Sequence, residues 1–305
     1  MTAKTLLITG ASGFMGSHLL DLVWHDQANY RVKAFQGDIT SRKDVVRNLR
    51  DVDTVINFAA LTYLPPSWYS PEAYARVNYE GVLNFMQNHE MFLRFVQIST
   101  SHVYGNQPKL PIEITMPPLP DDPYAIAKFA AEQAVKVYSE KFGFKSLIVR
   151  PFNNFGPRQS RHFVVPSFCI QAIEKGKIVV KGNTQRELIY VKDTARILKA
   201  LLDKGSTGLL QIAKGVVYSM FDLAKMVLTA AGKDPDASMV DLVPTERPFD
   251  IQTLLGSSKS LSDMLGTDFR GFMSMEQALK ETVDFYRYGE YLPLKRESVA
   301  VAAPD

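Results

Sequence analysis

A tyrosine and a lysine that could relay protons lie four residues apart, at the start of an alanine-rich stretch. On a helix, Tyr124 and Lys128 would share one face, and the Asp-Asp-Pro that precedes Tyr124 can begin such a helix. A neighbouring ammonium favours the phenolate, so we expect Lys128 to lower the pKa of Tyr124. The same spacing recurs at Tyr291 and Lys295, where an enclosed proline opposes a regular helix. We therefore take Tyr124 and Lys128 as the pair that carries chemistry.

Three glycines, three residues apart, follow the first apolar run of the chain. In Gly10-Ala-Ser-Gly13-Phe-Met-Gly16, the first glycine permits a tight turn and the second lets a pyrophosphate approach the backbone. The third lets a helix pack closely on a strand, and the N-terminus of that helix would face the phosphates. This segment predicts a dinucleotide site. The acidic residue expected about 20 residues later, on the adenosine ribose, is missing after Phe35, which leaves NAD or NADP open.

Short apolar runs alternate with helical patterns over the first half of the chain. The runs cover residues 5–9, 53–58, 95–99 and 146–150, and the helical patterns cover 16–24, 76–86 and 124–142. This alternation predicts an α/β fold, a Rossmann-type doubly wound parallel sheet. After about residue 153 the elements become shorter and less regular, which predicts a smaller C-terminal substrate-binding cap. We expect an NAD(P)-binding domain over 1–152 and 185–213, a cap over 153–184 and 214–290, and a tail over 291–305.

Composition excludes several classes of function. The chain has 305 residues with 35 basic and 32 acidic side chains, a net charge of +3, so nucleic acid is not an expected partner. No apolar run reaches the roughly 18 residues of a membrane span, and we see no signal peptide. The single cysteine, Cys169, excludes an intramolecular disulfide, and the five histidines lack metal-ligand spacing. We therefore expect a cytoplasmic protein without a metal site.

Taken together, the ordered motifs of the chain resemble those of the extended short-chain dehydrogenase/reductase family, closest to its nucleotide-sugar epimerase/dehydratase branch. The resemblance covers about residues 5–290. Beside the glycine loop and the Tyr124/Lys128 pair, it rests on Gly37-Asp38-Ile39, Asn57-Phe-Ala-Ala60, Ser99-Thr-Ser-His-Val-Tyr-Gly105, Arg150-Pro-Phe-Asn-Asn-Phe-Gly-Pro-Arg158, Arg186-Glu-Leu-Ile-Tyr-Val-Lys-Asp193 and Arg247-Pro-Phe-Asp250.

The resemblance implies a role for each matching position. Tyr124 would be the acid/base, Thr100 would bond the sugar hydroxyl being oxidised, and Lys128 would bond the nicotinamide ribose. The cofactor would be NAD, with NADP not excluded, and its implied contacts are Gly10, Gly13, Phe14, Met15, Gly16, Asp38, Ile39, Phe58, Ala59, Ala60, Ser99, Tyr124 and Lys128. A nucleotide-diphosphate sugar would be the substrate, and its implied contacts are Ser101, His102, Asn153, Arg161, Arg186 and Arg247. Guanidinium groups suit phosphate oxygens. A homodimer is also implied.

Two departures from the family pattern bear on function. The segment before Gly37 is shorter than in typical members, so the chain either keeps a second strand at residues 31–35 without its helix or loses that strand. In the family's 4,6-dehydratases an Asp-Glu pair follows the catalytic threonine, whereas this chain has Ser101 and His102 there. Histidine can act as a base near neutral pH, although His102 could equally have a structural or hydrogen-bonding role.

These residues predict an NAD-dependent nucleotide-hexose 4-epimerase that works through a 4-keto intermediate, because this reaction needs only Thr100, Tyr124 and Lys128. One alternative is a nucleotide-sugar 4,6-dehydratase in which His102 replaces the usual glutamate. Another is an NADPH-dependent keto-sugar reductase, suggested by the short segment before Gly37. A non-enzymatic NAD(P)-binding protein is the fourth hypothesis.

Overall fold

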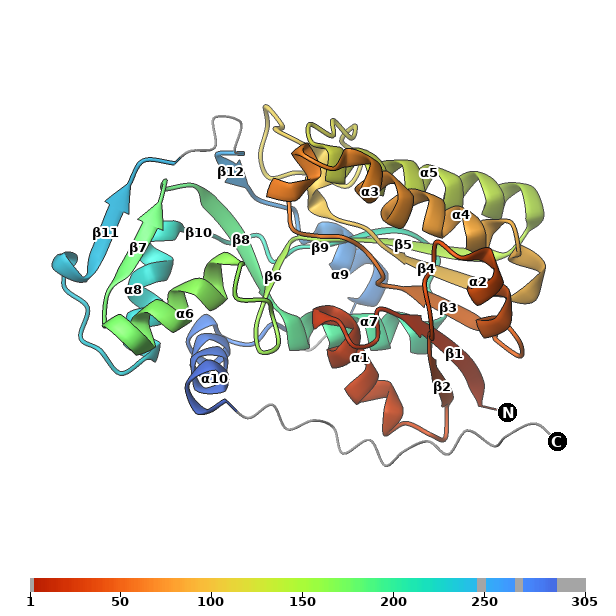
Figure 1. The fold of residues 1–305 in the computed structure, drawn as a ribbon, viewed down its shortest axis with the longest axis horizontal. Helices are drawn as coiled ribbons and strands as arrows, with labels where there is room; N and C mark the ends of the chain where they lie inside the picture. The colour runs from red at the N-terminus through yellow and green to blue at the C-terminus, as the bar shows by residue number, and fades with distance from the viewer. Residues whose placement is uncertain (1–2, 246–250, 267–270, 290–305) are drawn as a thin grey trace.

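A six-stranded parallel sheet forms the centre of the molecule (Figure 1), in a computed structural model that describes residues 3–245, 251–266 and 271–289. The strand order is β2-β1-β3-β4-β5-β9, and each neighbouring pair is parallel. The strands are β1 (Lys4–Thr9), β2 (Tyr30–Ala34), β3 (Thr54–Asn57), β4 (Arg94–Ile98), β5 (Lys145–Pro151) and β9 (Gly208–Ile212). The Rossmann-type α/β fold predicted from the sequence is confirmed.

Helices cover both faces of this sheet, as the apolar runs of its strands require. On one face lie α2 (Arg42–Asn48), α3 (Pro71–Ala75), α4 (Gly81–Met86) and α5 (Pro123–Phe142), with a π-helical turn over Arg76–Glu80 joining α3 to α4. On the other face lie α1 (Phe14–Trp24), α7 (Val191–Lys204) and α9 (Lys259–Leu265).

Local sequence sets the bounds of α5, the longest of the described helices. Asp122 is its N-cap and accepts a hydrogen bond from the Ala125 N–H at 2.7 Å. Pro123 occupies the first turn, where its missing N–H costs nothing. Gly143 ends the helix with a left-handed φ of 80°. Tyr124 and Lys128 therefore lie on the first turns of a helix, as their spacing predicted.

The C-terminal part builds a smaller layer beside the sheet (Figure 1). Strand β8 (Gln185–Tyr190) hydrogen-bonds to β6 (Asn153–Phe155), β10 (Val217–Ser219) and β12 (Thr253–Leu254), while β7 (Ile178–Lys181) pairs with β11 (Val240–Val243). Helices α6 (Val164–Lys175), α8 (Met220–Ala230) and α10 (Met275–Tyr288) share a second apolar core with these strands. The predicted domain boundaries stay a prediction. Strand β8 lies within residues 185–213, which we expected in the nucleotide-binding domain, but it pairs with β6, β10 and β12 of the C-terminal layer. Residues 291–305, the expected tail, lie outside the described residues.

The short segment between the glycine loop and Gly37 keeps its strand, β2. β2 pairs in register with β1, and the chain then reaches Gly37 and Asp38 within a few residues, without a helix between Ala34 and Asp38. The Asp44 carboxylate stabilises this direct passage by accepting a hydrogen bond from the Asp38 N–H at 3.1 Å. Gly37 has a φ of 111°, and a Cβ there would lie 2.5 Å from the same carboxylate. Of the two readings of the sequence, the one that keeps the strand is therefore correct.

Alkylation of Cys169 is expected to fail in the native protein. The thiol lies on α6 with no exposed surface, and burial raises its pKa to about 12, so the reactive thiolate is scarce near neutral pH. Mass spectrometry after iodoacetamide treatment should show an unmodified native chain and one label per chain in guanidinium. Rapid labelling of the native protein would contradict this packing.

None of the helices in the described ranges combines the length and apolarity needed to cross a bilayer. Within the same ranges, no three His, Cys, Asp or Glu side chains lie close enough together to hold a metal ion.

Candidate active site

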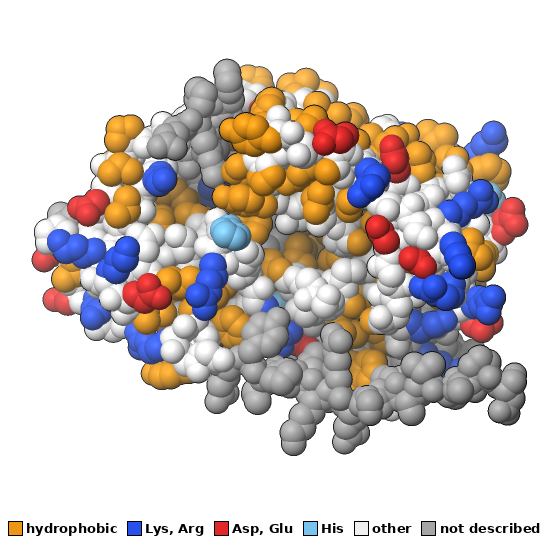
Figure 2. Space-filling model, in the orientation of Figure 1, with side chains coloured by type: hydrophobic (Ala, Val, Ile, Leu, Met, Phe, Trp, Pro, Cys, Tyr) orange, Lys and Arg blue, Asp and Glu red, His pale blue; other side chains and the backbone are white. Residues whose placement is uncertain are grey.

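A cavity of about 930 Å³ opens at the carboxyl ends of the central strands, where they meet the C-terminal layer. Figure 2 shows the molecule hollowed at this junction, with apolar side chains along its upper edge. The chain adds β2 on one side of β1 and β3 on the other, so the strand order reverses direction between β1 and β3. Open α/β sheets bind ligands at the carboxyl ends of the strands beside such a reversal. Of the residues predicted from the sequence, the lining contains Gly10, Gly13, Phe14, Met15, Gly16, Phe58, Ala59, Ala60, Ser99, Thr100, His102, Tyr124, Lys128, Asn153 and Arg186.

The glycine loop forms one end of this cavity. Gly10 has a φ of 60°, and its carbonyl accepts a hydrogen bond from the Gly13 N–H at 2.9 Å. A Cβ on Gly16 would lie only 2.2 Å from the Gly10 oxygen, so α1 and the loop touch through backbone atoms alone. The N-terminus of α1, which begins at Phe14, therefore faces the cavity with its free N–H groups.

The Gly16→Ala variant is expected to lose its dinucleotide. The added methyl group would overlap the Gly10 carbonyl and force the loop away from α1, which removes the phosphate-binding N–H groups from their places. Gly232→Ala is the control, because Gly232 lies outside the cavity with open space around it, and its left-handed φ of 80° strains the backbone of that variant without touching the loop. Nucleotide released from the two denatured proteins should differ strongly. Equal occupancy would show that the close contact is not needed.

Tyr124 and Thr100 meet on the wall of the cavity. A side-chain hydrogen bond with Thr100 lowers the pKa of Tyr124, but burial outweighs it and raises that pKa to about 12. Lys128 donates to the Ile98 carbonyl at 2.5 Å, and burial lowers the pKa of its ammonium to about 8. The expected lowering of the Tyr124 pKa by Lys128 was therefore wrong, because removing the phenolate from water costs more than its neighbours restore.

A buried network of Arg150, Glu132 and Ser99 lies next to Thr100 and Lys128 in the chain's fold. Arg150 donates to both carboxylate oxygens of Glu132, from Nε at 2.9 Å and from Nη2 at 2.5 Å, and Ser99 donates a short hydrogen bond to the same carboxylate. The Arg150 guanidinium also lies 4.8 Å from the centre of the Tyr104 ring. Glu132 raises the pKa of Lys128, against the effect of burial. The network therefore ties the carboxyl ends of β4 and β5 to α5.

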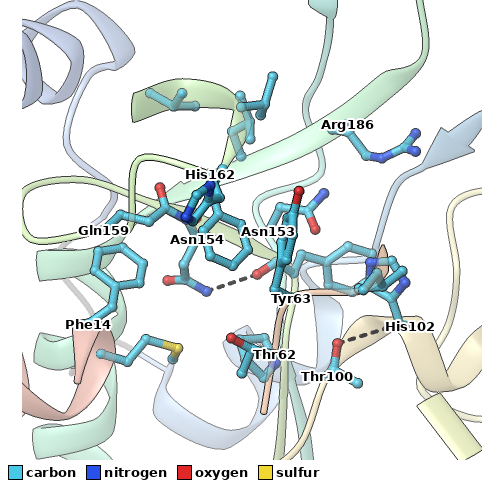
Figure 3. A pocket seen from close by; sticks show the side chains of 18 of the residues that line it. Phe14, Thr62, Tyr63, Thr100, His102, Asn153, Asn154, Gln159, His162 and Arg186 are labelled. Atoms are coloured by element: carbon cyan, nitrogen blue, oxygen red, sulfur yellow. Dashed lines mark hydrogen bonds between the residues drawn. The ribbon is translucent and has the colours of Figure 1, made fainter. Parts of the chain in front are cut away.

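The side chains of Ser101 and His102, the two residues after Thr100, point in different directions. The turn Ser101–Tyr104 begins with the His102 N–H donating to Thr100 Oγ1 at 3.2 Å, and the His102 ring lines the cavity (Figure 3). The His102 and Tyr124 rings lie 6.2 Å apart, inclined at 69°. Ser101 is 1% exposed, does not line the cavity, and its hydroxyl has no partner among the described residues. The predicted substrate contact of Ser101 is therefore not supported by its position.

Other predicted residues lie away from the cavity. The exposed Asp38 carboxylate accepts from the Thr40 N–H at 2.8 Å, and Ile39 packs into the core against α4 because it fills the space beside Gly81. Neither lines the cavity, and the adenine contact implied for them stays a prediction. Arg161, shortly before α6, is exposed and also lies outside the lining. Arg247 lies outside the described residues.

Several lining residues had no sequence signal of their own. Tyr63, after β3, lies 5.7 Å from the His162 ring and 5.9 Å from the Phe163 ring, so segments far apart in the chain meet over the cavity (Figure 3). His162, the residue after Arg161, also lies in the lining. Lys181, Asn154 and Gln159 complete the polar lining on the cap side.

The charge of the lining is one-sided. Among the described residues it contains Lys128, Lys181 and Arg186 but no aspartate or glutamate. A cavity lined by cations concentrates anionic ligands. The glycine loop at one end and Lys181 with Arg186 at the other suit two phosphate-bearing groups, one from each side.

Comparisons with known proteins place this geometry in a family context. A model described as the NAD dependent epimerase/dehydratase family matches residues 6–213. The chain is similar to a low-salt glycan biosynthesis protein of Haloferax volcanii, with 29% identity over 92% of this chain and 98% of that protein. It is also similar to a dTDP-glucose 4,6-dehydratase of Streptomyces niveus, with 27% identity over 98% of each chain. Among solved structures, the UDP-glucose 4-epimerase of Thermus thermophilus in complex with NAD has 26% identity and a TM-score of 0.82, covering 93% of this chain and 99% of that one.

Proposed function

Because this chain belongs to the NAD-dependent epimerase/dehydratase family, we propose that it is a nucleotide-hexose 4-epimerase that acts through a 4-keto intermediate. The observation that carries the proposal is the meeting of Thr100, Tyr124 and Lys128 beside the glycine loop, in a cavity to which the described residues contribute no carboxylate. Epimerisation at C4 requires removal and return of one hydride and one hydroxyl proton, with rotation of the keto-sugar between the two steps.

The residues present fit NAD. Gly16 leaves no room for a side chain between the loop and α1, which is the close packing that a pyrophosphate site requires. Gly10, Gly13 and the N-terminus of α1 would hold the phosphates, Phe58 to Ala60 would line the path of the cofactor, and Lys128 would bond the nicotinamide ribose. When bound, NAD supplies a hydride acceptor whose positive charge favours the Tyr124 phenolate.

The chain's own residues move the proton. Tyr124 removes the proton of the sugar hydroxyl, and Thr100 orients both groups through its hydrogen bond with the tyrosine. After the keto-sugar has rotated, Tyr124 returns the proton to the C4 oxygen, and the configuration inverts because the hydride would return to the opposite face of C4. Asn153 and Arg186, with Lys181, would hold the diphosphate of the substrate, because their cationic and amide groups suit its oxygens.

The position of Ser101 supports an epimerase rather than a dehydratase. Elimination of water from the sugar needs an acid for the leaving hydroxyl, and the Ser101 hydroxyl is buried outside the cavity. A 4,6-dehydratase nevertheless stays the second candidate, because His102 lines the cavity and named relatives include dehydratases. Its distinguishing product would be a 6-deoxy-4-keto sugar.

The proposed function also carries expectations for the location, partners and oligomeric state of the protein. We expect a cytoplasmic enzyme that acts on a small-molecule substrate, with neither nucleic acid nor membrane as a partner. The exposed apolar residues Ile126 and Val137 on α5 support a homodimer through this helix. Light scattering on the purified protein would give twice the mass of the chain if this is correct.

The test begins with mass spectrometry of the supernatant of denatured protein. We expect about one NAD per chain, followed by interconversion of C4 epimers when UDP-, dTDP- and GDP-hexoses are supplied. A 6-deoxy-4-keto product would establish the dehydratase instead. A chain that carries no nucleotide but consumes NADPH with a keto-sugar would overturn the proposal in favour of a reductase.

A further inference from the structure

The loop after β3, residues 58–64, forms part of the cavity wall and is called the wall loop below. All of its residues line the cavity except Leu61, whose backbone is held by a buried amide. The Leu61 N–H donates to Asn78 Oδ1 at 2.8 Å, and Asn78 Nδ2 donates to the Leu61 carbonyl at 3.0 Å. Asn78 is 1% exposed, so both bonds are shielded from water. The wall loop is thus fixed at Leu61.

Tyr74 provides a second anchor two residues further along the wall loop. Its hydroxyl donates a hydrogen bond to the Tyr63 carbonyl, and the residue is 4% exposed. Tyr74 lies on α3 and Asn78 on the π-helical turn that follows, so one continuous helical segment supplies both anchors. From this anchored backbone, the Tyr63 ring reaches the rings of His162 and Phe163 on the cap side (Figure 3). The Tyr74 hydroxyl therefore sets where the wall loop meets the cap.

The ring of Tyr74 contacts the ring of Tyr124. The two ring centres lie 6.4 Å apart and the ring planes are inclined at 85°, an edge-to-face arrangement that aromatic pairs favour. Burial raises the pKa of both phenols, so Tyr74 stays protonated near neutral pH and directs its proton to the Tyr63 carbonyl. Tyr74 is therefore not a proton-transfer group itself, but its ring occupies the space beside the Tyr124 ring.

We propose that Tyr74 is a positioning residue that holds the wall loop and the acid/base in fixed places relative to each other. The inference rests on the proposed function, in which Tyr124 removes the proton of the sugar hydroxyl. The hydroxyl of Tyr74 acts on substrate binding, because it fixes the wall loop through Tyr63. Its ring acts on the chemical step, because it limits the positions that the Tyr124 ring can take. A displacement of about 1 Å at a reacting group can lower a rate by about 10²-fold.

Hydrogen exchange measured by mass spectrometry tests the anchor without any substrate. In Tyr74→Phe, the backbone amides of the wall loop should exchange faster than in the wild type, because the Tyr63 carbonyl loses this hydrogen bond. Tyr69→Phe is the matched control, since Tyr69 lies between the wall loop and α3 but is 87% exposed and outside the cavity lining. The control should exchange as the wild type does. Equal exchange in Tyr74→Phe and Tyr69→Phe would overturn the anchor.

Binding and single-turnover oxidation of nucleotide sugars test the two effects of Tyr74 separately. With UDP-glucose, UDP-galactose and dTDP-glucose as probes, Tyr74→Phe should weaken binding by about 10-fold in calorimetry and keep the wild-type rate of oxidation at saturation. Tyr74→Leu, which also lacks the ring, should weaken binding and in addition lower the rate at saturation by about 10²-fold. Tyr69→Phe and Tyr69→Leu should match the wild type in both measurements.

The division between binding and rate decides the inference. A structural role alone would lower the melting temperature of Tyr74→Leu and leave its saturating rate at the wild-type value, which would overturn the inference. Wild-type affinity in Tyr74→Phe, which fills the same space, would overturn it even if Tyr74→Leu did not fold. Failure of the wild type to bind or oxidise any probe would instead count against the proposed function, and hydrogen exchange would still decide the anchor.

Discussion

The Tyr124→Phe variant is expected to keep its NAD and to lose about 10²–10⁴-fold in the rate at which a nucleotide sugar is oxidised. The cofactor should remain because the glycine loop and Lys128, which would hold it, are unchanged. The loss should be large because Tyr124, which contacts Thr100 in the cavity, is the proposed acid/base, and the described lining has no carboxylate that could replace it. Absorbance of the reduced nicotinamide in a single turnover gives the rate directly.

Tyr138→Phe is the matched control for this experiment. Tyr138 lies on the same helix, but its ring packs against Phe142, far along α5 from the cavity. The Tyr138→Phe variant should retain both its bound NAD and the wild-type rate of sugar oxidation. If Tyr124→Phe oxidised the sugar as fast as Tyr138→Phe, the tyrosine would have no part in proton transfer and the mechanism proposed here would fail.

The Arg150→Leu variant is expected to lower the free energy of unfolding by about 3–5 kcal/mol, since it leaves the Glu132 charge buried and unpaired. Arg150 is 3% exposed and Glu132 is 1% exposed, and Ser99 alone would remain as a partner of the carboxylate. Urea denaturation of the ligand-free proteins measures the difference. Because Glu132 also raises the pKa of Lys128, the same network supports the charge of the catalytic lysine.

A double variant distinguishes the cost of leaving the Glu132 charge unpaired from the cost of losing the packing of the Arg150 side chain. Adding Glu132→Gln to Arg150→Leu removes the unpaired charge and should recover much of the lost stability. Lys259→Ala breaks an exposed ion pair with Asp263 on α9 and should leave the denaturation midpoint where it was. If the double variant were as unstable as Arg150→Leu, the cost would come from the missing side chain rather than from the charge.

The sequence by itself determined the features that depend on short spacings. Strand and helix patterns follow from local periodicity, so β1, β3, β4, β5 and α5 could be predicted within a residue or two, whereas β9 was not predicted. The glycine loop needs only its own backbone and the helix that follows it. Tyr124 and Lys128 share a face because residues four apart on a helix are neighbours, whatever surrounds them.

Only the tertiary structure decided which side chains meet across elements and what their surroundings do to them. Ser101 and His102 are adjacent in sequence, yet one is buried outside the cavity and the other lines it, because the turn after β4 alternates their directions. Burial reversed the expected change in the Tyr124 pKa, since the desolvation of a group depends on everything packed around it. The approach of Asp122 to His102 and the contact of Tyr63 with His162 join distant segments, and no local pattern encodes such distances.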